Sequence, residues 1–400
     1  MSDANRVAIA RVLETDITAV DPPTTGWAYT RYTSESMKNA VGSTASNELR
    51  SDRQTADLIQ TDLRANGGFQ GELSYSTYDD LLQSALQSGA WASPAEQTST
   101  GSGVSVAANV VSRADGDWLE DGFRVGMFVR ADGLTTTADD TDYVVVAVTE
   151  ADLTLTGKTM SNQVTPNAAT FTQLDEISNG TTLTYFAFEK DFQDLATEFH
   201  LLRAMAPDTL ALTVAPSQIL TVEFGFLGRS MTRGTTTKST GATPSTQTSS
   251  DVMNAITNVA WTVLGDDGAV PPLVGLTNIT GNLTNNLRER LQIGSLGAVS
   301  IGSGTVGLTG NITAFFGNTA GVPGTAMLDK LLAFDDAFFA LKIQDAAGNV
   351  YGIAMPRIKF SDGEVLAGGI NSDVLLSLEY QAIKSTDVGA KTIRIARIPA

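Results

Sequence analysis

The residue types that most often carry chemistry are scarce in this chain. His200 is its only histidine, and it lies in the apolar stretch from Glu198 to Leu202, where a structural role is expected. A Ser-His-Asp triad would have to use this histidine, and the best serine, Ser300, is followed by no helical pattern. The chain has no cysteine, which removes thiolate nucleophiles, thiolate zinc sites and disulfides together. We therefore predict that the protein is not an enzyme.

Two further motifs fit a structural role better than a chemical one. Residues 302–307 satisfy the dinucleotide-binding fingerprint, but residues 308–316 read as a strand where that motif needs a helix. The carboxylates of Asp139, Asp140 and Asp142 resemble a calcium-binding cluster, but they lack the spacing of a known calcium loop. We predict no cofactor and no metal ion.

The composition is that of a folded, acidic protein. With 400 residues, 42% of them hydrophobic and 18% charged, the chain is globular and long enough for two or three compact units. With a net charge of −18, the chain has no excess of basic residues for binding nucleic acid. The acidic charge favours solubility or a surface that repels a polyanion. No apolar run approaches the length of a membrane span and the N-terminus lacks an apolar signal region, so we expect neither.

Alternation with a period of two dominates the chain and predicts half-buried strands. The segments 219–226 and 374–382 place apolar residues on one face and polar residues on the other. Only two segments follow the helical period: residues 78–86, with Thr77 as a possible cap, and a segment that begins near Thr325. A mainly β chain with two helices belongs to the α+β class.

The two helices have similar surroundings, which we interpret as an internal duplication. We predict one domain from residues 1–97 and 177–231 and a second from residues 252–400, each a β-sandwich or barrel with one flanking helix. Residues 98–176 form an insertion whose short strands suggest a small β-barrel or immunoglobulin-like domain. The polar stretch 232–251 is predicted to link the two copies.

Several segments of the chain resemble parts of one known family. The sequence from Glu48 to Arg53 and the sequence from Gly68 to Leu82 look like the N-terminal region of the major tail proteins, or tail-tube proteins, of siphophages. The segment from Asp121 to Gly126 is similar to an accessory domain that some members carry. The segment from Ile353 to Ile358 is similar to a family strand near the C-terminus.

The resemblance implies how copies of the protein would assemble. Tube domains join their sheets edge to edge, so that unpaired strand edges become one closed barrel around a lumen. Rings then stack through a long loop, here about residues 39–66, on which Arg50, Asp52, Arg53 and Asp57 would pair between rings. An acidic lumen would keep DNA from sticking to the wall.

The duplication changes the expected number of chains in a ring. If each chain supplies two tube domains, three chains complete a pseudo-sixfold ring, with a homohexamer as the alternative. The resemblance then implies a structural virion protein, made in the host bacterial cytoplasm, whose stacked rings form the hollow tail that DNA passes through. Its other partners would be the terminator and distal tail proteins at the tube ends and the tape measure inside. A receptor- or carbohydrate-binding tail appendage is the alternative function.

Overall fold

The computed structural model describes residues 3–92, 96–98, 103–167, 169–243, 252–256, 259–265, 275–317 and 324–399. This part of the chain is mainly β with two helices, α1 (Asp79–Ala85) and α2 (Gly324–Ala333), which confirms the expected fold class. The strands outside the insertion are β1 (Val7–Glu14), β2 (Ala28–Tyr29), β3 (Ser34–Glu35), β4 (Lys38–Ala45), β5 (Leu58–Glu72), β14 (Asp175–Ser178), β15 (Tyr185–Phe192), β16 (Phe199–Val214), β17 (Thr221–Gly228), β18 (Ser230–Gly234), β19 (Val259–Gly265), β20 (Leu276–Thr284), β21 (Arg288–Arg290), β22 (Ser300–Gly302), β23 (Gly307–Phe315), β24 (Asp336–Gln344), β25 (Val350–Ala367), β26 (Val374–Ala382) and β27 (Arg394–Ile398).

The first helix begins with two acidic residues, Asp79 and Asp80, which interact favourably with the positive end of the helix dipole. The expectation that Thr77 caps this helix was wrong. Tyr78 occupies the cap position and makes no side-chain cap hydrogen bond, while the Thr77 hydroxyl lies 2.6 Å from the Ser74 hydroxyl. The Thr77 hydroxyl is therefore engaged within the turn that precedes the helix and does not cap it.

Two units of the main sheet have the same strand order. In the first unit, β4 pairs with β5, and the order continues through β17, β16 and β15 to β1. In the second unit, β20 pairs with β23, and the order continues through β26, β25 and β24 to β19. Strand β18 pairs with the first half of β16, and β27 with the first half of β25. Each unit also carries one helix, between β5 and β15 or between β23 and β24.

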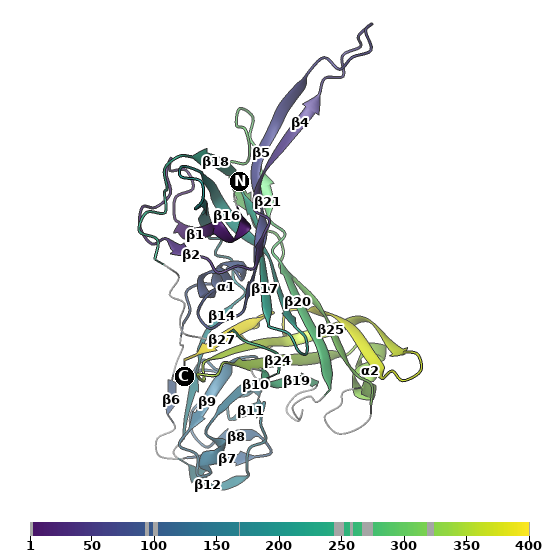
Figure 1. Ribbon diagram of the computed structural model, residues 1–400. Helices are drawn as coiled ribbons and strands as arrows, with labels where there is room; N and C mark the ends of the chain where they lie inside the picture. Colours follow the sequence, from purple (N-terminus) through teal and green to yellow (C-terminus); the bar gives the residue numbers. More distant parts are fainter. Residues whose placement is uncertain are drawn as a thin grey trace.

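The two units are joined through one strand pair. The second half of β16 pairs with β20, from Thr209 opposite Thr284 to Val214 opposite Ile279. The result is one antiparallel sheet of eight strands in the order β4-β5-β17-β16-β20-β23-β26-β25, which we call the joined sheet. In Figure 1, β4 and β5 extend from it as an arm at one end of the molecule, and β25 points out to the side.

One face of the joined sheet is buried in the main core. Residues directly opposite one another on neighbouring strands point to the same face. The core-facing row that runs across seven strands is Phe69, Phe224, Leu210, Leu283, Leu308, Ala382 and Ile358. All seven side chains are buried, and α1 packs onto the same core through Leu81 and Leu82. An apolar cavity of about 70 Å³ remains between the two units, where β16 and β20 face β24 and β25.

The insertion forms a separate sheet of eight strands around its own core. Its strands are β6 (Glu96–Thr98), β7 (Val104–Ala107), β8 (Val110–Arg113), β9 (Phe128–Asp132), β10 (Asp142–Val148), β11 (Asp152–Thr156), β12 (Gln163–Asn167) and β13 (Thr170–Gln173). Trp118 packs edge-on against Phe123 and Phe171 in the centre of this core. Figure 1 shows the sheet at the end of the molecule opposite the arm.

The inserted sheet is fixed to the second unit by an apolar contact and an ion pair. Phe128 and Val144 of the insertion share a buried cluster with Phe338 of β24. Beside them, the Lys342 ammonium group lies 2.9 Å from the Asp142 carboxylate, and both side chains are buried. A buried charge is costly unless it is paired, so each of these two groups stabilises the other where the inserted sheet meets β24.

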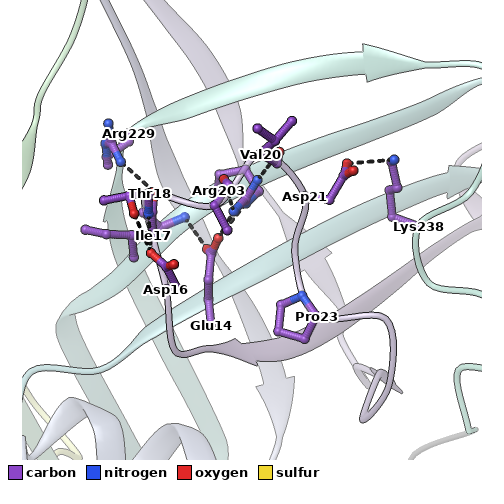
Figure 2. A network of polar contacts seen from close by, with 12 residues as sticks. Glu14, Asp16, Ile17, Thr18, Val20, Asp21, Pro23, Arg203, Arg229 and Lys238 are labelled. Carbon is purple, nitrogen blue, oxygen red and sulfur yellow. Dashed lines mark hydrogen bonds and ion pairs between the residues drawn. The ribbon is translucent and has the colours of Figure 1, made fainter.

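The loop after β1 is held against the first unit by a buried polar network (Figure 2). Arg203 donates from Nε to Glu14 at 2.5 Å and from its other nitrogens to the carbonyl groups of Ala19 and Val20. Glu14 also accepts the backbone N–H of Ala204, whose φ of 53° is left-handed. Non-glycine residues rarely adopt this conformation, so Glu14 stabilises the bulge that β16 makes opposite β15.

The start of the polar stretch between the two units packs onto the first unit. Residues 230–234 form β18, and the backbone N–H groups of Lys238 and Ser239 donate to the buried Glu189 carboxylate. The Ser239 hydroxyl donates to the same carboxylate at 2.6 Å. Residues 244–251 lie outside the described residues.

Candidate assembly surfaces

The face of the joined sheet that points away from the core is polar. A first row of directly opposite residues crosses seven strands as Glu72, Thr221, Thr213, Thr280, Asn311, Glu379 and Asp362. A second row crosses them as Gln70, Glu223, Ala211, Asn282, Thr309, Gln381 and Lys359. Hydroxyl and amide side chains predominate in both rows. The charged residues are four carboxylates (Glu72, Glu223, Glu379 and Asp362) and one ammonium group (Lys359), so this face is acidic.

The joined sheet has two open borders. The first is residues 35–40 of β3 and β4, which we call the β4 border; in the described chain this segment pairs only with β5. The second is residues 362–367 of β25, which pair only with β26 and which we call the β25 border. Such edges present free backbone donors and acceptors and are ready templates for another strand.

Three residues on the borders have polar groups that the described chain leaves unused. Lys38 on the β4 border and Glu364 on the β25 border form no ion pair with another described residue. The side-chain oxygen of Asn39 is buried and has no hydrogen-bond partner in the described part of the chain. Buried polar atoms are normally satisfied, so the Asn39 oxygen calls for an explanation.

The expectation that about residues 39–66 form a long loop was wrong in its extent, because most of this segment is paired strand in a β-hairpin and only its tip is a loop. Strands β4 and β5 form its stem, and residues 46–57 form the connecting loop that carries the four predicted contact residues. Arg50 and Asp52 pair with each other at 3.0 Å, a contact that raises the pKa of Arg50 and lowers that of Asp52. Arg53 has a left-handed φ of 59°, and Asp57 accepts the N–H of Leu58. The hairpin thus displays Arg50, Asp52, Arg53 and Asp57 together at an exposed tip.

A buried polar junction ties α1 of the first unit to the C-terminal strands of the second. Asp79 accepts a hydrogen bond from the Tyr351 hydroxyl and one from Arg397, whose guanidinium group lies 2.5 Å away. Arg397 also binds Asp175 at 2.7 Å and stacks on the Trp91 ring at 4.5 Å. Burial, and then the charge of Asp79, raise the pKa of Tyr351 well above its ordinary value, so the phenol remains a hydrogen-bond donor.

The residues whose types could take part in catalysis or metal binding do not lie together in one site. His200 lies on β16 with a ring nitrogen 2.9 Å from Glu198, and packs edge-on against Phe192. Hydrogen bonds from Arg233 and His200 lower the pKa of Glu198 to about 2, so this carboxylate is a stable anion within a surface cluster. These contacts are structural.

The acidic cluster of the insertion is divided among separate partners. Asp139 accepts from the N–H of Ser161, Asp140 from the N–H of Leu134, and Asp142 from Lys342. Among the described residues, no group of three or more acidic or histidine side chains is arranged to hold a metal ion.

The glycine-rich motif at residues 302–307 leads into β23, a strand, as the sequence predicted. A polar hollow of about 450 Å³ lies beside the network of Figure 2. Its cations are already engaged: Arg203 binds Glu14, Lys238 binds Asp21, and Arg229 donates to the carbonyl groups of Ile17 and Ala298. Arg203 and Lys238 are thus paired with carboxylates, while Arg229 is held by hydrogen bonds to two carbonyl groups.

The described helices include none with the length and apolar character needed to cross a membrane. The prominent surfaces are instead a polar sheet face, two open borders and an exposed hairpin, as in a mainly β structural protein, and open borders of this kind can pair with other strands. The chain belongs to the phage tail tube protein family, whose model matches residues 4–382. It is thereby a structural component of the phage tail. No curated protein matches the chain in a sequence search.

The sequence reasoning missed the border residues Lys38, Asn39 and Glu364. The two units can be aligned strand by strand through their pairing registers. In that alignment the position of Lys38 is held in the other unit by Asn282, and the position of Glu364 by Ala211; both are uncharged. A charge present in only one of the two units was the available signal. Recognising this difference requires an alignment of the two units, and only the strand registers provide that alignment.

Proposed function

We propose that this protein is the major tail tube protein of a long-tailed phage and that three copies close into a ring. Rings stack into a hollow tube through which the genome passes. The domain division that supports this proposal has residues 1–97 with 177–231 as one tube domain, residues 252–400 as the second, residues 98–176 as the inserted domain and residues 232–251 between the copies.

The pairing of β16 with β20 is the observation that carries the proposal. It joins two units of equal strand order side by side, and leaves the same two kinds of border open at the ends of the joined sheet. Repeating that junction between chains adds eight strands per copy, so three copies supply twenty-four. A barrel of about eight strands is filled by side chains, whereas barrels of about 16 strands already enclose an aqueous channel.

The polar face of the joined sheet is proposed to line the lumen, since its other face is occupied by the core. Its hydroxyl and amide groups would keep the wall hydrated. Its excess of carboxylates would repel the phosphate backbone, and DNA could then slide without being bound.

The hairpin tip is proposed to mediate stacking, with Arg50, Asp52, Arg53 and Asp57 as contacts between rings. The terminator and distal tail proteins would cap the two ends of the tube, and the tape measure would fill its lumen before DNA enters.

Electron microscopy and native mass spectrometry of the purified protein test this function. We expect hollow rings or tubes and a repeating mass of three chains. A protein that remains monomeric at high concentration, with no rings, would overturn the proposal. A repeat of six chains would replace the trimer by a hexamer.

A further inference from the structure

We propose a specific register for ring closure: residues 35–40 of one copy pair antiparallel with residues 362–367 of a second copy. In this register Ala40 lies opposite Asp362, Lys38 opposite Glu364, and Glu35 opposite Ala367. The inference rests on the proposed ring, but it makes a separate claim about which residues meet.

The first step aligns β16 with β25. A row in the first unit runs from Gly67 through Phe226 to Pro207. A row in the second unit runs from Gly310 through Tyr380 to Phe360. In both units a bulge follows at once, between Pro207 and Thr209 and between Phe360 and Asp362. Bulges are specific structural features, so their coincidence makes Asp362 the counterpart of Thr209.

The second step aligns β4 with β20 and β21. With Gly67 matched to Gly310, the pair Ala45–Leu58 in the arm corresponds to the pair Glu289–Ile301 in the short hairpin β21–β22. The counterparts are thus fixed at both ends of these strands. Ala40, which pairs with Arg64, then corresponds to Thr284, which pairs with Gly307.

The third step transfers the junction within the chain to the open borders. Inside the chain, Thr209 is opposite Thr284 and Ala211 is opposite Asn282. Replacing each residue by its counterpart places Asp362 opposite Ala40 and Glu364 opposite Lys38. The β25 border has six residues, the same number as the pairing from Thr209 to Val214.

Two features that played no part in the alignment fit this register. Lys38 and Glu364 carry opposite charges, and directly opposite charges on neighbouring strands stabilise the pairing. Asn39 falls opposite Gly363, which has no side chain of its own and whose Cβ position is covered by Leu378 and Leu331. The second copy would therefore bring backbone groups close to the buried Asn39 oxygen that has no partner within the described chain.

A disulfide experiment tests the register. Because the chain has no native cysteine, only the introduced thiols can form disulfides. The variant Ala40→Cys/Asp362→Cys places two thiols directly opposite, within the distance that a disulfide spans. The matched control Ser36→Cys/Asp362→Cys keeps Lys38 and Glu364 and moves one thiol four residues along the border, about 13 Å at 3.3 Å per residue, which is beyond bridging. After mild oxidation we expect covalent trimers from the first variant and almost none from the control.

The possible outcomes separate the register from the function. Rings seen by microscopy with equal or reversed cross-linking would overturn the register and leave the tube function standing. A series of disulfide-linked species that ends at six chains would support the register and overturn the trimer. Absence of rings in the wild-type protein would overturn the function itself.

A charge exchange provides a second test that needs no disulfide. Lys38→Glu and Glu364→Lys, made singly, each place like charges opposite and should lower the yield of rings at least several-fold at low salt. The double variant Lys38→Glu/Glu364→Lys should restore the yield. A double variant no better than the single ones, with all variants equally folded by circular dichroism, would contradict the pairing.

Discussion

Lys190 donates a hydrogen bond from Nζ to the carbonyl oxygen of Met37 at 2.5 Å, in the middle of the β4 border. Lys190 also binds the Glu35 carboxylate at 2.5 Å, and Glu35 accepts the N–H of Met37 at 2.9 Å. Ser36 donates its N–H to Gly68 of β5, so by alternation the backbone groups of Met37 point to the open side. Lys190 and Glu35 thus cap the border at the site where a second copy would pair. Charged side chains on sheet edges are a known protection against premature association.

Removing this cap should speed assembly. In the variant Glu35→Gln/Lys190→Met the Met37 backbone groups lose their charged partners, so we expect a shorter lag and tube formation at lower protein concentration. Light scattering at matched concentrations measures both. Lys238→Met removes a lysine paired with Asp21 away from the borders and serves as the control. Slower assembly of the double variant than of the wild type would contradict a capping role.

The Tyr351–Asp79 hydrogen bond should contribute to the coupling of the two units. Tyr351→Phe leaves the buried Asp79 carboxylate with one donor fewer, which is expected to lower the free energy of unfolding by about 1–3 kcal/mol. Urea denaturation measures the change. Tyr185→Phe is the matched control, because the Tyr185 hydroxyl makes only a 3.4 Å contact with Ile301. An effect of Tyr351→Phe no greater than that of the control would show that the junction is not coupled to stability.

The Lys342–Asp142 pair should anchor the inserted sheet. Lys342→Met leaves Asp142 buried beside one remaining cation, Arg130, and we expect a loss of about 3 kcal/mol. Arg130→Ala removes a half-exposed partner and should cost about 1 kcal/mol or less. Hydrogen exchange within the β9–β10 hairpin would report local loosening. Equal effects of the two variants would argue against an anchoring role of the buried pair.

The same ion pair predicts an acid sensitivity. Burial by itself raises the pKa of Asp142, but the hydrogen bond from Arg130 and the charge of Lys342 outweigh burial and lower the pKa below its ordinary value. A lowered pKa in the folded state stabilises the fold above the unfolded value of about 3.9, and this contribution is lost as the pH falls through the folded pKa. The stability difference between wild type and Asp142→Asn should be constant above about pH 5 and shrink below about pH 4. A difference unchanged down to pH 3 would refute the assignment.

The charges at the hairpin tip should affect stacking without affecting rings. Arg50 and Asp52 satisfy each other within the loop, so Arg53 and Asp57 are the better candidates for contacts between rings. Arg53→Gln/Asp57→Asn should shorten tubes seen by electron microscopy and leave the ring mass unchanged, while Arg50→Gln/Asp52→Asn should have a smaller effect. Added salt should reduce the difference, because exposed charges are screened within about 8–10 Å. Wild-type tube lengths from both variants would remove these residues from the stacking contact.

Local signals in the sequence were sufficient for the elements themselves. The alternation at residues 374–382 matches β26 (Val374–Ala382), because a strand with one buried face must repeat every two residues. The helical period at residues 78–86 likewise located α1, whose first turn holds Asp79 and Asp80. Thr77 was misassigned because its hydroxyl lies against the hydroxyl of Ser74 in the preceding turn, and the side-chain period does not show which of these partners the hydroxyl takes.

The sequence by itself determined a mainly β chain with two helices, with few groups able to do chemistry and with similar segments around each helix. Those properties are local, since side-chain period and residue type decide them. The tertiary structure alone decided that β16 pairs with β20, that Lys190 reaches Met37, and that Lys38 and Glu364 stand on open borders. Strand partners and registers depend on backbone hydrogen bonds between distant residues, and any two amphipathic strands carry the same alternating pattern. Only the folded arrangement distinguishes the pairs that form from those that remain open.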